Sequence, residues 1–298
     1  MCKRTIRITI LTVVALVFLG PPLPVAAQFR DALGREILLE KPPERIIALA
    51  PSLTEILYFL GLGNKVVGVT QFSSYPPDAA QKPRVGSYID LNVERIITLA
   101  PDLVIGTVDG NERQEVELLE QAGIAVYVVN PRNVGDLIET IQDVGSLCGV
   151  PQRAKAQSHQ LASRVDRIVQ KTRSLPKPLV FVQIQLKPIM TVNRETFHHD
   201  LIRLSGGRNM TGDEPVTYPR ISLEEVIRRK PEVILISSME RQGRFEKARR
   251  EWFRWTSIPA VQTGRVHLID SDLIDRPSPR LIEGLETMAT FVHPEVFK

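Results

Sequence analysis

Short apolar runs alternate with helical patterns along the first half of the chain, from about residue 45 onward. Four of these runs are apolar throughout: residues 46–49, 66–69, 103–105 and 125–129. Three helical patterns lie around them: residues 53–60, 112–122 and 134–148. Wholly apolar strands are typical of a parallel sheet that helices cover on both faces. Residues 28–150 are therefore predicted to form one α/β lobe.

The same alternation begins again after residue 178. Four strands are predicted in this half: residues 179–184, 189–192, 233–236 and 266–269. Four helices are predicted as well: residues 196–204, 222–229, 244–252 and 279–291. The pattern indicates a second α/β lobe with a mostly parallel sheet over residues 175–298.

Residues 151–174 join the two lobes and have the pattern of one continuous helix. The segment contains no Gly, and no Pro after its first position. Four residues form an apolar stripe at helical spacing: Leu161, Val165, Ile168 and Val169. A helix of this length would span ~33 Å, about the length of a small domain. We therefore expect a rigid strut that holds two lobes apart, with a ligand cleft between them.

One sequence device occurs twice, as LNVERIITLAPDLVI at 91–105 and as ISLEEVIRRKPEVIL at 221–235. In each copy a predicted helix is followed by a proline and then by a predicted buried strand. Asn92 and Ser222 stand two residues before Glu94 and Glu224, and are expected to be N-caps. Both glutamates then lie in a first helical turn, where a negative charge interacts favourably with the helix dipole and stabilises the helix by ~0.3–1 kcal/mol.

A third helix start is predicted in the first lobe. Ser52 precedes the helical pattern, and Glu55 follows three residues later. This spacing is that of a capping box, in which the two side chains bond to each other's backbone amides. Gly61 stands where the helix would end.

The first 27 residues have the three-part layout of a secretory signal peptide. Lys3, Arg4 and Arg7 precede an apolar run over 8–19, and the sequence VAA at 25–27 offers the small residues of a cleavage site. An uncleaved membrane anchor is the alternative, but the run is shorter than the ~20 apolar residues that a bilayer span needs. We expect a cleaved leader and a soluble product outside the cytoplasmic membrane.

The overall composition excludes several classes of protein. With 43% hydrophobic and 24% charged residues, the chain is typical of soluble globular proteins, and 298 residues fit two domains. The leader holds three basic and no acidic residues, so its removal lowers the formal charge from +4 to +1. That charge gives no case for a nucleic-acid partner. The basic, aromatic stretch at 240–255 contains interleaved glutamates and is interpreted as a solvated helix face.

Signatures of catalysis and of ATP binding are absent from the sequence. The glycine cluster GLGNKVVG at 61–68 has the wrong spacing for a phosphate loop, and there is no GxSxG elbow. After removal of the leader, Cys148 is the one cysteine, so no internal disulfide can form. His198 and His199 are adjacent, and neighbours on a helix point ~100° apart, so no metal site is expected from this pair.

Long stretches of the chain resemble the periplasmic cobalamin-binding proteins of ABC importers. The resemblance is carried by RIIALAPSLTEILYFLGLGNKVVGVTQFSSYPPDA, PRVGSYIDLNVERIITLAPDLVIG, LSGGRNM, TYPRISLEEVIRRKPEVIL and DLIDRPSPRLIEGLE, and it covers about residues 45–294. It implies two lobes of Rossmann-like topology that hold a corrinoid between them, with no catalysis and no cofactor. It also implies a periplasmic location, and we expect a monomer.

The resemblance further implies a set of ligand contacts. Four positions match residues that face the corrin: Phe72, Tyr88, Met190 and Tyr218. Tyr88 and Tyr218 stand where the best-matching cobalamin binder has tryptophans. Asp272 and Arg276 match the ends of a loop that hydrogen-bonds corrin amides. From the residues alone, Phe72 could equally be a loop aromatic that only packs.

The resemblance also implies a function for the sequence pattern that occurs twice. Glu94 and Glu224 match acidic residues that contact arginines on the two subunits of a permease dimer. Two alternatives stay open for the function. Haem or a ferric siderophore could be the ligand in the same family, and an exported tetrapyrrole metal chelatase would have similar lobes. A chelatase would need a His and an acid that face the groove together, and the sequence offers no clear pair.

Overall fold

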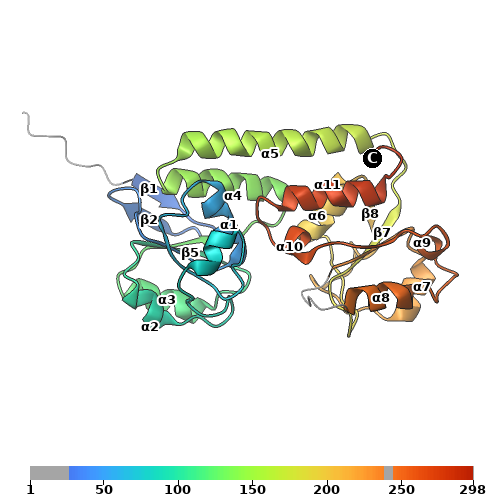
Figure 1. Cartoon of the computed structure of the whole chain (residues 1–298), viewed down its shortest axis with the longest axis horizontal. Helices are drawn as coiled ribbons and strands as arrows, with labels where there is room; N and C mark the ends of the chain where they lie inside the picture. Colours follow the sequence, from blue (N-terminus) through green and yellow to red (C-terminus); the bar gives the residue numbers. More distant parts are fainter. Residues whose placement is uncertain (1–26, 238–243, 298) are drawn as a thin grey trace, which may run out of the picture.

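The computed structural model describes residues 27–237 and 244–297. Two lobes lie side by side, and the long helix α5 (Pro151–Thr172) runs along both of them (Figure 1). The predicted signal peptide lies outside the described residues, except for Ala27. None of the helices in the described part of the chain combines the length and the apolar character that a membrane crossing requires.

The N-terminal lobe is built on a four-stranded parallel sheet in the order β4-β3-β5-β6. Its strands are β3 (Ile46–Ala48), β4 (Val66–Val69), β5 (Leu103–Thr107) and β6 (Val126–Val129). Its helices are α1 (Pro51–Phe59), the short 3₁₀ helix η1 (Pro77–Gln81), α2 (Val93–Thr98), α3 (Arg113–Gln121) and α4 (Val134–Leu147). The predicted strands and helices of this half are confirmed to within two residues at each end. A hairpin of β1 (Ala27–Arg30) and β2 (Glu36–Leu39) was not predicted.

The apolar strands of this lobe lie between two separate cores. Ile46 and Ile105 pack into one core, whereas their neighbours Ile47 and Val104 pack into the other. Successive side chains on a strand point to opposite faces of the sheet. The strands are therefore apolar throughout because helices cover both faces, which is the reason that the sequence pattern indicated.

The C-terminal lobe repeats this plan with a parallel sheet in the order β10-β9-β7-β8. Its strands are β7 (Leu179–Gln183), β8 (Arg208–Asn209), β9 (Val233–Ile236) and β10 (Val266–Leu268). Its helices are α6 (Phe197–Leu204), α7 (Leu223–Arg229), α8 (Arg244–Trp252), α9 (Pro259–Gln262), α10 (Ser271–Ile274) and α11 (Leu281–Val292). The fold class predicted from the sequence, two α/β lobes with parallel sheets and one long connecting helix, is confirmed.

The strand predicted at 189–192 is wrong. Met190 makes only isolated bridges, to Gln185 and to Arg220, and the segment joins no ladder of the sheet. Thr191 and Asn193 donate their backbone amides to the carbonyls of Pro219 and Thr217. The apolar run therefore pairs with a loop outside the sheet, and Ile189 and Met190 are half-buried.

Helix α5 is fastened to both lobes. Its buried face runs along the whole helix: Ala154, Ser158, Leu161, Val165, Ile168 and Thr172. In the N-terminal lobe, Arg153 and Gln157 donate to the carbonyls of Leu60 and Phe59, at 2.9 and 2.7 Å. In the C-terminal lobe, Arg164 forms a two-pronged ion pair with Glu286 of α11 at 2.9 and 2.7 Å. Side-chain bonds to both lobes make this helix a braced strut between them.

Candidate functional site

The two glutamates of the repeated device occupy equivalent places in the two lobes. Asn92 accepts a hydrogen bond from the amide of Arg95 and caps α2, and Ser222 accepts one from the amide of Glu225 and caps α7. Both predicted N-caps are thus confirmed. Glu94 and Glu224 lie in the first turns that follow, and both are exposed. Figure 1 places α2 and α7 on the side of the lobes away from α5.

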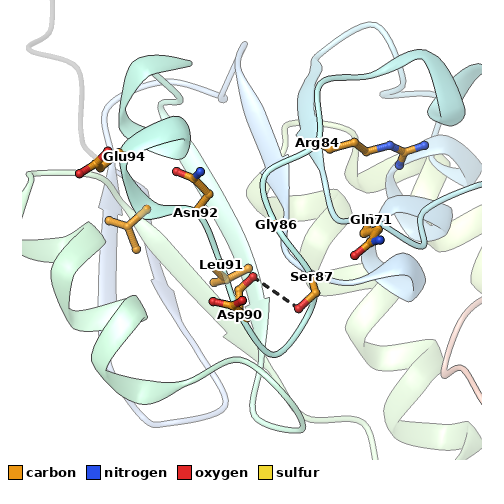
Figure 2. Close-up of a pocket in the computed structure, with 9 residues that line it drawn as sticks. Gln71, Arg84, Gly86, Ser87, Asp90, Leu91, Asn92 and Glu94 are labelled. Atoms are coloured by element: carbon orange, nitrogen blue, oxygen red, sulfur yellow. Dashed lines mark hydrogen bonds between the residues drawn. The ribbon is translucent and has the colours of Figure 1, made fainter.

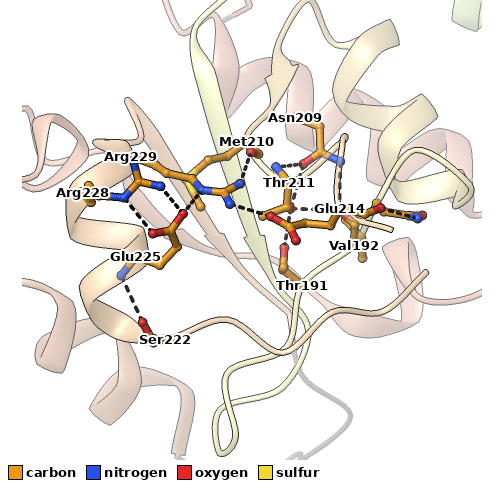
Figure 3. Close-up of polar contacts among 11 residues, drawn as sticks. Thr191, Val192, Asn209, Met210, Thr211, Glu214, Ser222, Glu225, Arg228 and Arg229 are labelled. Atoms are coloured by element: carbon orange, nitrogen blue, oxygen red, sulfur yellow. Dashed lines mark hydrogen bonds and ion pairs between the residues drawn. The ribbon is translucent and has the colours of Figure 1, made fainter. Parts of the chain in front are cut away.

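Glu225, the next residue along α7, has a different environment. Its carboxylate accepts hydrogen bonds from Arg228 and Arg229, and Arg229 also reaches Glu214 and the carbonyl of Met210 (Figure 3). The side-chain hydrogen bond from Arg228, followed by that from Arg229, lowers the pKa of Glu225 to about 2. Glu225 is therefore bound within its own lobe, which leaves Glu224 as the acid of this turn that points outward.

An open hollow of about 820 Å³ lies beside Glu94 in the N-terminal lobe. Glu94 and Asn92 stand on the α2 side of it, and Arg84 and Gln71 stand on the other side (Figure 2). Its wall also contains Asp90, whose carbonyl accepts a hydrogen bond from the Ser87 hydroxyl at 3.4 Å. The hollow thus presents two carboxylates, the guanidinium of Arg84 and several uncharged polar groups next to an exposed helix start.

Tyr88 is held closely against the loop that follows β5 in the N-terminal lobe. Asn111 donates to its backbone carbonyl at 2.8 Å, and a side-chain carbon on Gly110 would come within 2.0 Å of its ring. Gly110, at φ +116°, therefore lets the tyrosine ring lie directly on the loop after β5. Burial, and then the charge of Asp109, raises the pKa of Tyr88.

Tyr218 reaches the same region from the C-terminal lobe. Burial raises the pKa of Tyr218, and the Asp109 charge, next in size, raises it further. Arg132 opposes this shift, and Tyr88 adds to it. Asp109, Arg132 and Tyr88 belong to the N-terminal lobe, so electrostatic interactions reach Tyr218 across the junction of the lobes.

An ion pair that the sequence did not reveal lies in this region. Arg132 donates to both carboxylate oxygens of Asp109, at 2.8 and 3.1 Å. The two residues follow β6 and β5, at the carboxyl ends of parallel strands, where ligands of open α/β sheets are usually bound. The paired side chains are 40% and 49% exposed, so they are open to a ligand beside Tyr88.

The loop that begins at α10 is fixed from within its own lobe. Asp275 accepts a hydrogen bond from the hydroxyl of Ser237 at 2.9 Å and lies 3.0 Å from Nε2 of His198. Arg276 forms an ion pair with Asp272 at 3.1 Å, so the two predicted amide-binding residues are in contact. His198 and Asp275 form the His and acid pair that sequence reasoning did not find. Their side chains are 4% and 8% exposed, so the pair is packed and does not line an open groove.

Glu55 faces this loop from the N-terminal lobe, and the predicted capping box is wrong. Helix α1 starts at Pro51 with Ala50 as its N-cap, and no side chain caps it. Pro51 supplies a preset φ at a first turn and has no amide that needs a partner. The side chain of Glu55 is therefore free to leave the helix start, and its carboxylate accepts a 2.7 Å hydrogen bond from Ser278 of the opposite lobe.

Two predicted ligand contacts have less defined environments. Phe72 is 59% exposed on the loop after β4, a large apolar area for a ring that does not pack into the core. Met190 is half-buried in the segment that pairs with Arg220, two residues from Tyr218. Among the residues that the structure describes, no group of three or more His, Cys, Asp and Glu side chains could hold a metal ion.

Comparison with known proteins gives consistent matches over most of the chain. Residues 46–273 match the model of the family described as "Periplasmic binding protein". The "Vitamin B12-binding protein" of Vibrio vulnificus (strain CMCP6) is 32% identical over 248 residues, which cover 82% of this chain and 88% of that protein. The "Uncharacterized ABC transporter substrate-binding lipoprotein YvrC" of Bacillus subtilis (strain 168) is 31% identical, over 90% of this chain and 86% of its own length.

A solved structure matches at a similar level. The periplasmic vitamin B12 binding protein BtuF of Vibrio cholerae superimposes with a TM-score of 0.76 at 31% sequence identity. The match covers 85% of this chain and 98% of that chain. The two lobes and the connecting helix described above thus belong to a known arrangement.

Proposed function

This chain belongs to the periplasmic binding protein family, and from that premise we propose that it captures a corrinoid, cobalamin, and delivers it to an ABC-type membrane importer. It is a binding protein and not an enzyme. The observation that carries the proposed ligand is the match, along more than four fifths of the chain, to relatives named for vitamin B12 binding. The relative named as a substrate-binding lipoprotein of an ABC transporter supports the importer as the recipient.

The proposed ligand lies between the lobes, with its flat face against the aromatic residues. A corrin is a broad, partly apolar disc with amides around its rim. Tyr88 and Tyr218 supply ring area with little loss of side-chain entropy, and Phe72 and Met190 add apolar surface. Asp272 and Arg276 are complementary to the rim, because a carboxylate accepts from an amide N–H and a guanidinium donates to an amide carbonyl.

Calorimetric titration tests the ligand. The protein without residues 1–27 is titrated with cyanocobalamin, cobinamide, haemin and a ferric siderophore under one buffer condition. We expect a saturable heat with the two corrinoids and none with the other ligands. We also expect Arg276→Ala to weaken corrinoid binding by ~1–3 kcal/mol, the usual cost of leaving a buried polar group without its partner. Tight binding of haemin or the siderophore alone would replace the corrinoid proposal with the corresponding family alternative.

The recipient is proposed to be a permease dimer that contacts both lobes at once. The exposed Glu94 and Glu224, each in the first turn of a capped helix, offer equivalent acids to two equivalent basic pockets. The hollow beside Glu94 supplies room for a loop of the permease. A monomer fits this geometry, since one chain provides both contacts. Residues 1–27 are proposed to direct export to the periplasm and to be removed afterwards.

A further inference from the structure

A cluster of charged groups around one buried carboxylate crosses the junction of the lobes near the loop after α10. Glu55, 3% exposed, reaches from α1 of the N-terminal lobe. Three residues of the C-terminal lobe surround its carboxylate. Ser278 donates to Oε2 at 2.7 Å, and the guanidinium groups of Arg276 and Arg280 lie 3.6 and 3.8 Å from Oε1. One acid from one lobe thus faces two bases from the other.

The contacts within the cluster are incomplete. Oε1 of Glu55 and Nη1 of Arg276 are both buried, and neither has a hydrogen-bond partner among the described residues. Burying a polar group without a hydrogen bond is unfavourable in free energy, and the penalty is larger for a charged group. Buried polar atoms in native proteins almost always have partners. A cluster that departs from this rule is better explained by a role in binding than by a gain in stability.

Each base of the cluster has a second contact. Arg276 pairs with Asp272 at 3.1 Å, and these two residues are the proposed contacts to the corrin amides. Arg280 stacks on the ring of Tyr75, whose centroid lies 4.2 Å from the guanidinium carbon. Within the C-terminal lobe, Asp275 anchors the same loop to His198 and Ser237. The loop therefore has one anchor in its own lobe and a second, through Glu55, in the opposite lobe.

We infer that Glu55 is a positioning residue for the ligand: from the opposite lobe, its carboxylate fixes the place of Arg276 at the junction where the corrinoid is proposed to lie. This inference rests on the proposed function. The attraction between Glu55 and Arg276 sets the place of the guanidinium relative to Tyr88 and Phe72, which share a lobe with Glu55. The amide-binding loop and the aromatic residues then face the ligand in one register. Glu55 itself need not touch the ligand.

A double-mutant cycle on ligand affinity tests this role. Glu55→Gln keeps the shape and the hydrogen bond from Ser278 but removes the charge that attracts Arg276. We expect Glu55→Gln to weaken binding of cyanocobalamin about tenfold, and Arg276→Met to weaken it by tenfold or more. The double variant should bind no more weakly than Arg276→Met alone, because Glu55 then has no guanidinium to position. Contacting residues in one network show such non-additive effects, whereas independent sites add.

Matched variants separate positioning from general loss of structure. Glu286→Gln makes the same chemical change in the ion pair with Arg164 of α5. It should leave affinity unchanged. Ser278→Ala removes the 2.7 Å bond to Glu55 and should give a smaller loss of affinity, absent in the Arg276→Met background. This variant serves as the test if Glu55→Gln does not fold, as judged by circular dichroism.

Two results would overturn the inference: wild-type affinity in Glu55→Gln, or losses from Glu55→Gln and Arg276→Met that multiply in the double variant. Failure of the proposed function looks different. There the wild-type protein gives no heat with cyanocobalamin and binds haemin or a ferric siderophore. The cycle is then measured with that ligand, and multiplying losses again overturn the role of Glu55.

Discussion

The hydroxyl of Ser278 donates a 2.7 Å hydrogen bond to the carboxylate of Glu55, joining two residues that lie 223 positions apart and in different lobes. The bond satisfies one oxygen of a carboxyl group that is 3% exposed. Burial is the largest influence on this group and raises the pKa of Glu55, whereas the hydrogen bond from Ser278 and the charges of Arg280 and Arg276 lower it. The charge of Asp272, the smallest of these influences, also raises it. Ionised Glu55 thus holds the lobes in register at a cost in stability.

That cost predicts a pH dependence of unfolding. The folded-state pKa of Glu55 is raised above its ordinary value of 4.5, so the folded protein retains this proton to higher pH than the unfolded chain. Wild-type protein should therefore lose stability relative to Glu55→Gln as pH rises from about 4.5 through the folded-state pKa, and should lose no more above it. The slope for one group cannot exceed ~1.4 kcal/mol per pH unit. Urea denaturation of both proteins without ligand, between pH 4 and 8, measures the difference.

The comparison with Glu55→Gln cancels the titration of groups far from the cluster, since both proteins share them. A stability difference of the opposite slope, with wild type gaining on Glu55→Gln as pH rises, would mean that the two arginines outweigh burial. A flat difference would mean that Glu55 titrates alike in the folded and unfolded states.

The exposed pair Glu94 and Glu224 predicts a defect in transport without a defect in binding. Changing both to Ala should lower uptake of the ligand by cells severely, at least tenfold, because each removes one charged contact to the permease. Affinity for cyanocobalamin should stay within twofold of wild type, since both side chains are exposed in the first turns of α2 and α7 and neither is a proposed ligand contact. Uptake of labelled ligand and calorimetry measure the two effects.

A matched control for this prediction changes one exposed glutamate per lobe on other helices. Glu139 of α4 and Glu283 of α11 are exposed and belong to helices that pack near α5. Glu139→Ala with Glu283→Ala should leave both uptake and affinity unchanged. A large loss of affinity in the Glu94 and Glu224 double variant would refute the docking role.

Much of the fold could be predicted from the sequence, because the patterns that define strands, helices and caps involve neighbouring residues. The alternation of wholly apolar runs with helical patterns located the strands of both sheets except β8 and the hairpin. Asn92 and Ser222 were identified as caps because capping depends on a few adjacent residues. Helix α5 was predicted from an uninterrupted run without glycine. The failure at 189–192 has the opposite cause, since an apolar run that pairs with a distant loop has the same local pattern as a strand.

The contacts of the candidate site were harder to predict from the sequence, because they join residues that lie far apart along the chain. Ser52 and Glu55 have the spacing of a capping box, yet Glu55 bonds to the other lobe, and no local signal distinguishes the two cases. The pair His198 and Asp275 and the pair Asp109 and Arg132 were missed for the same reason. One usable signal existed: Pro51 stands at the first helical position, which makes a side-chain cap less necessary.

Cys148 is predicted to be inert in the folded protein. Its side chain is 1% exposed, and burial raises the pKa of the thiol to about 12. Since the thiolate is the reactive form, the protein without residues 1–27, in which Cys148 is the one cysteine, should resist a thiol-specific reagent at pH 8 for hours. In 8 M urea the same thiol should react completely within minutes. Rapid stoichiometric labelling without denaturant would show that the helix junction around Cys148 opens easily.

Helices α4 and α5 pack closely at Gly145 and Ala154, and this close packing helps to fix α5 to the N-terminal lobe. A Cβ added to Gly145 would lie 2.2 Å from the Cβ of Ala154, far inside van der Waals contact. On a free helix, Gly145→Ala would stabilise by ~1 kcal/mol, but overpacking costs ~1–3 kcal/mol and here requires the helix backbones to separate. We expect a net loss of roughly 1–2 kcal/mol in the free energy of unfolding, measured by urea denaturation.

Ala154→Gly alone should also destabilise the protein, because it removes a buried methyl group and weakens the helix. Combined with Gly145→Ala it exchanges the two side chains across the interface, and the pair should be more stable than the sum of the single effects. Equal or greater stability of Gly145→Ala would mean that α5 can move away from α4 without cost, and the strut would then be less firmly fixed than its side-chain bonds to Leu60 and Phe59 indicate.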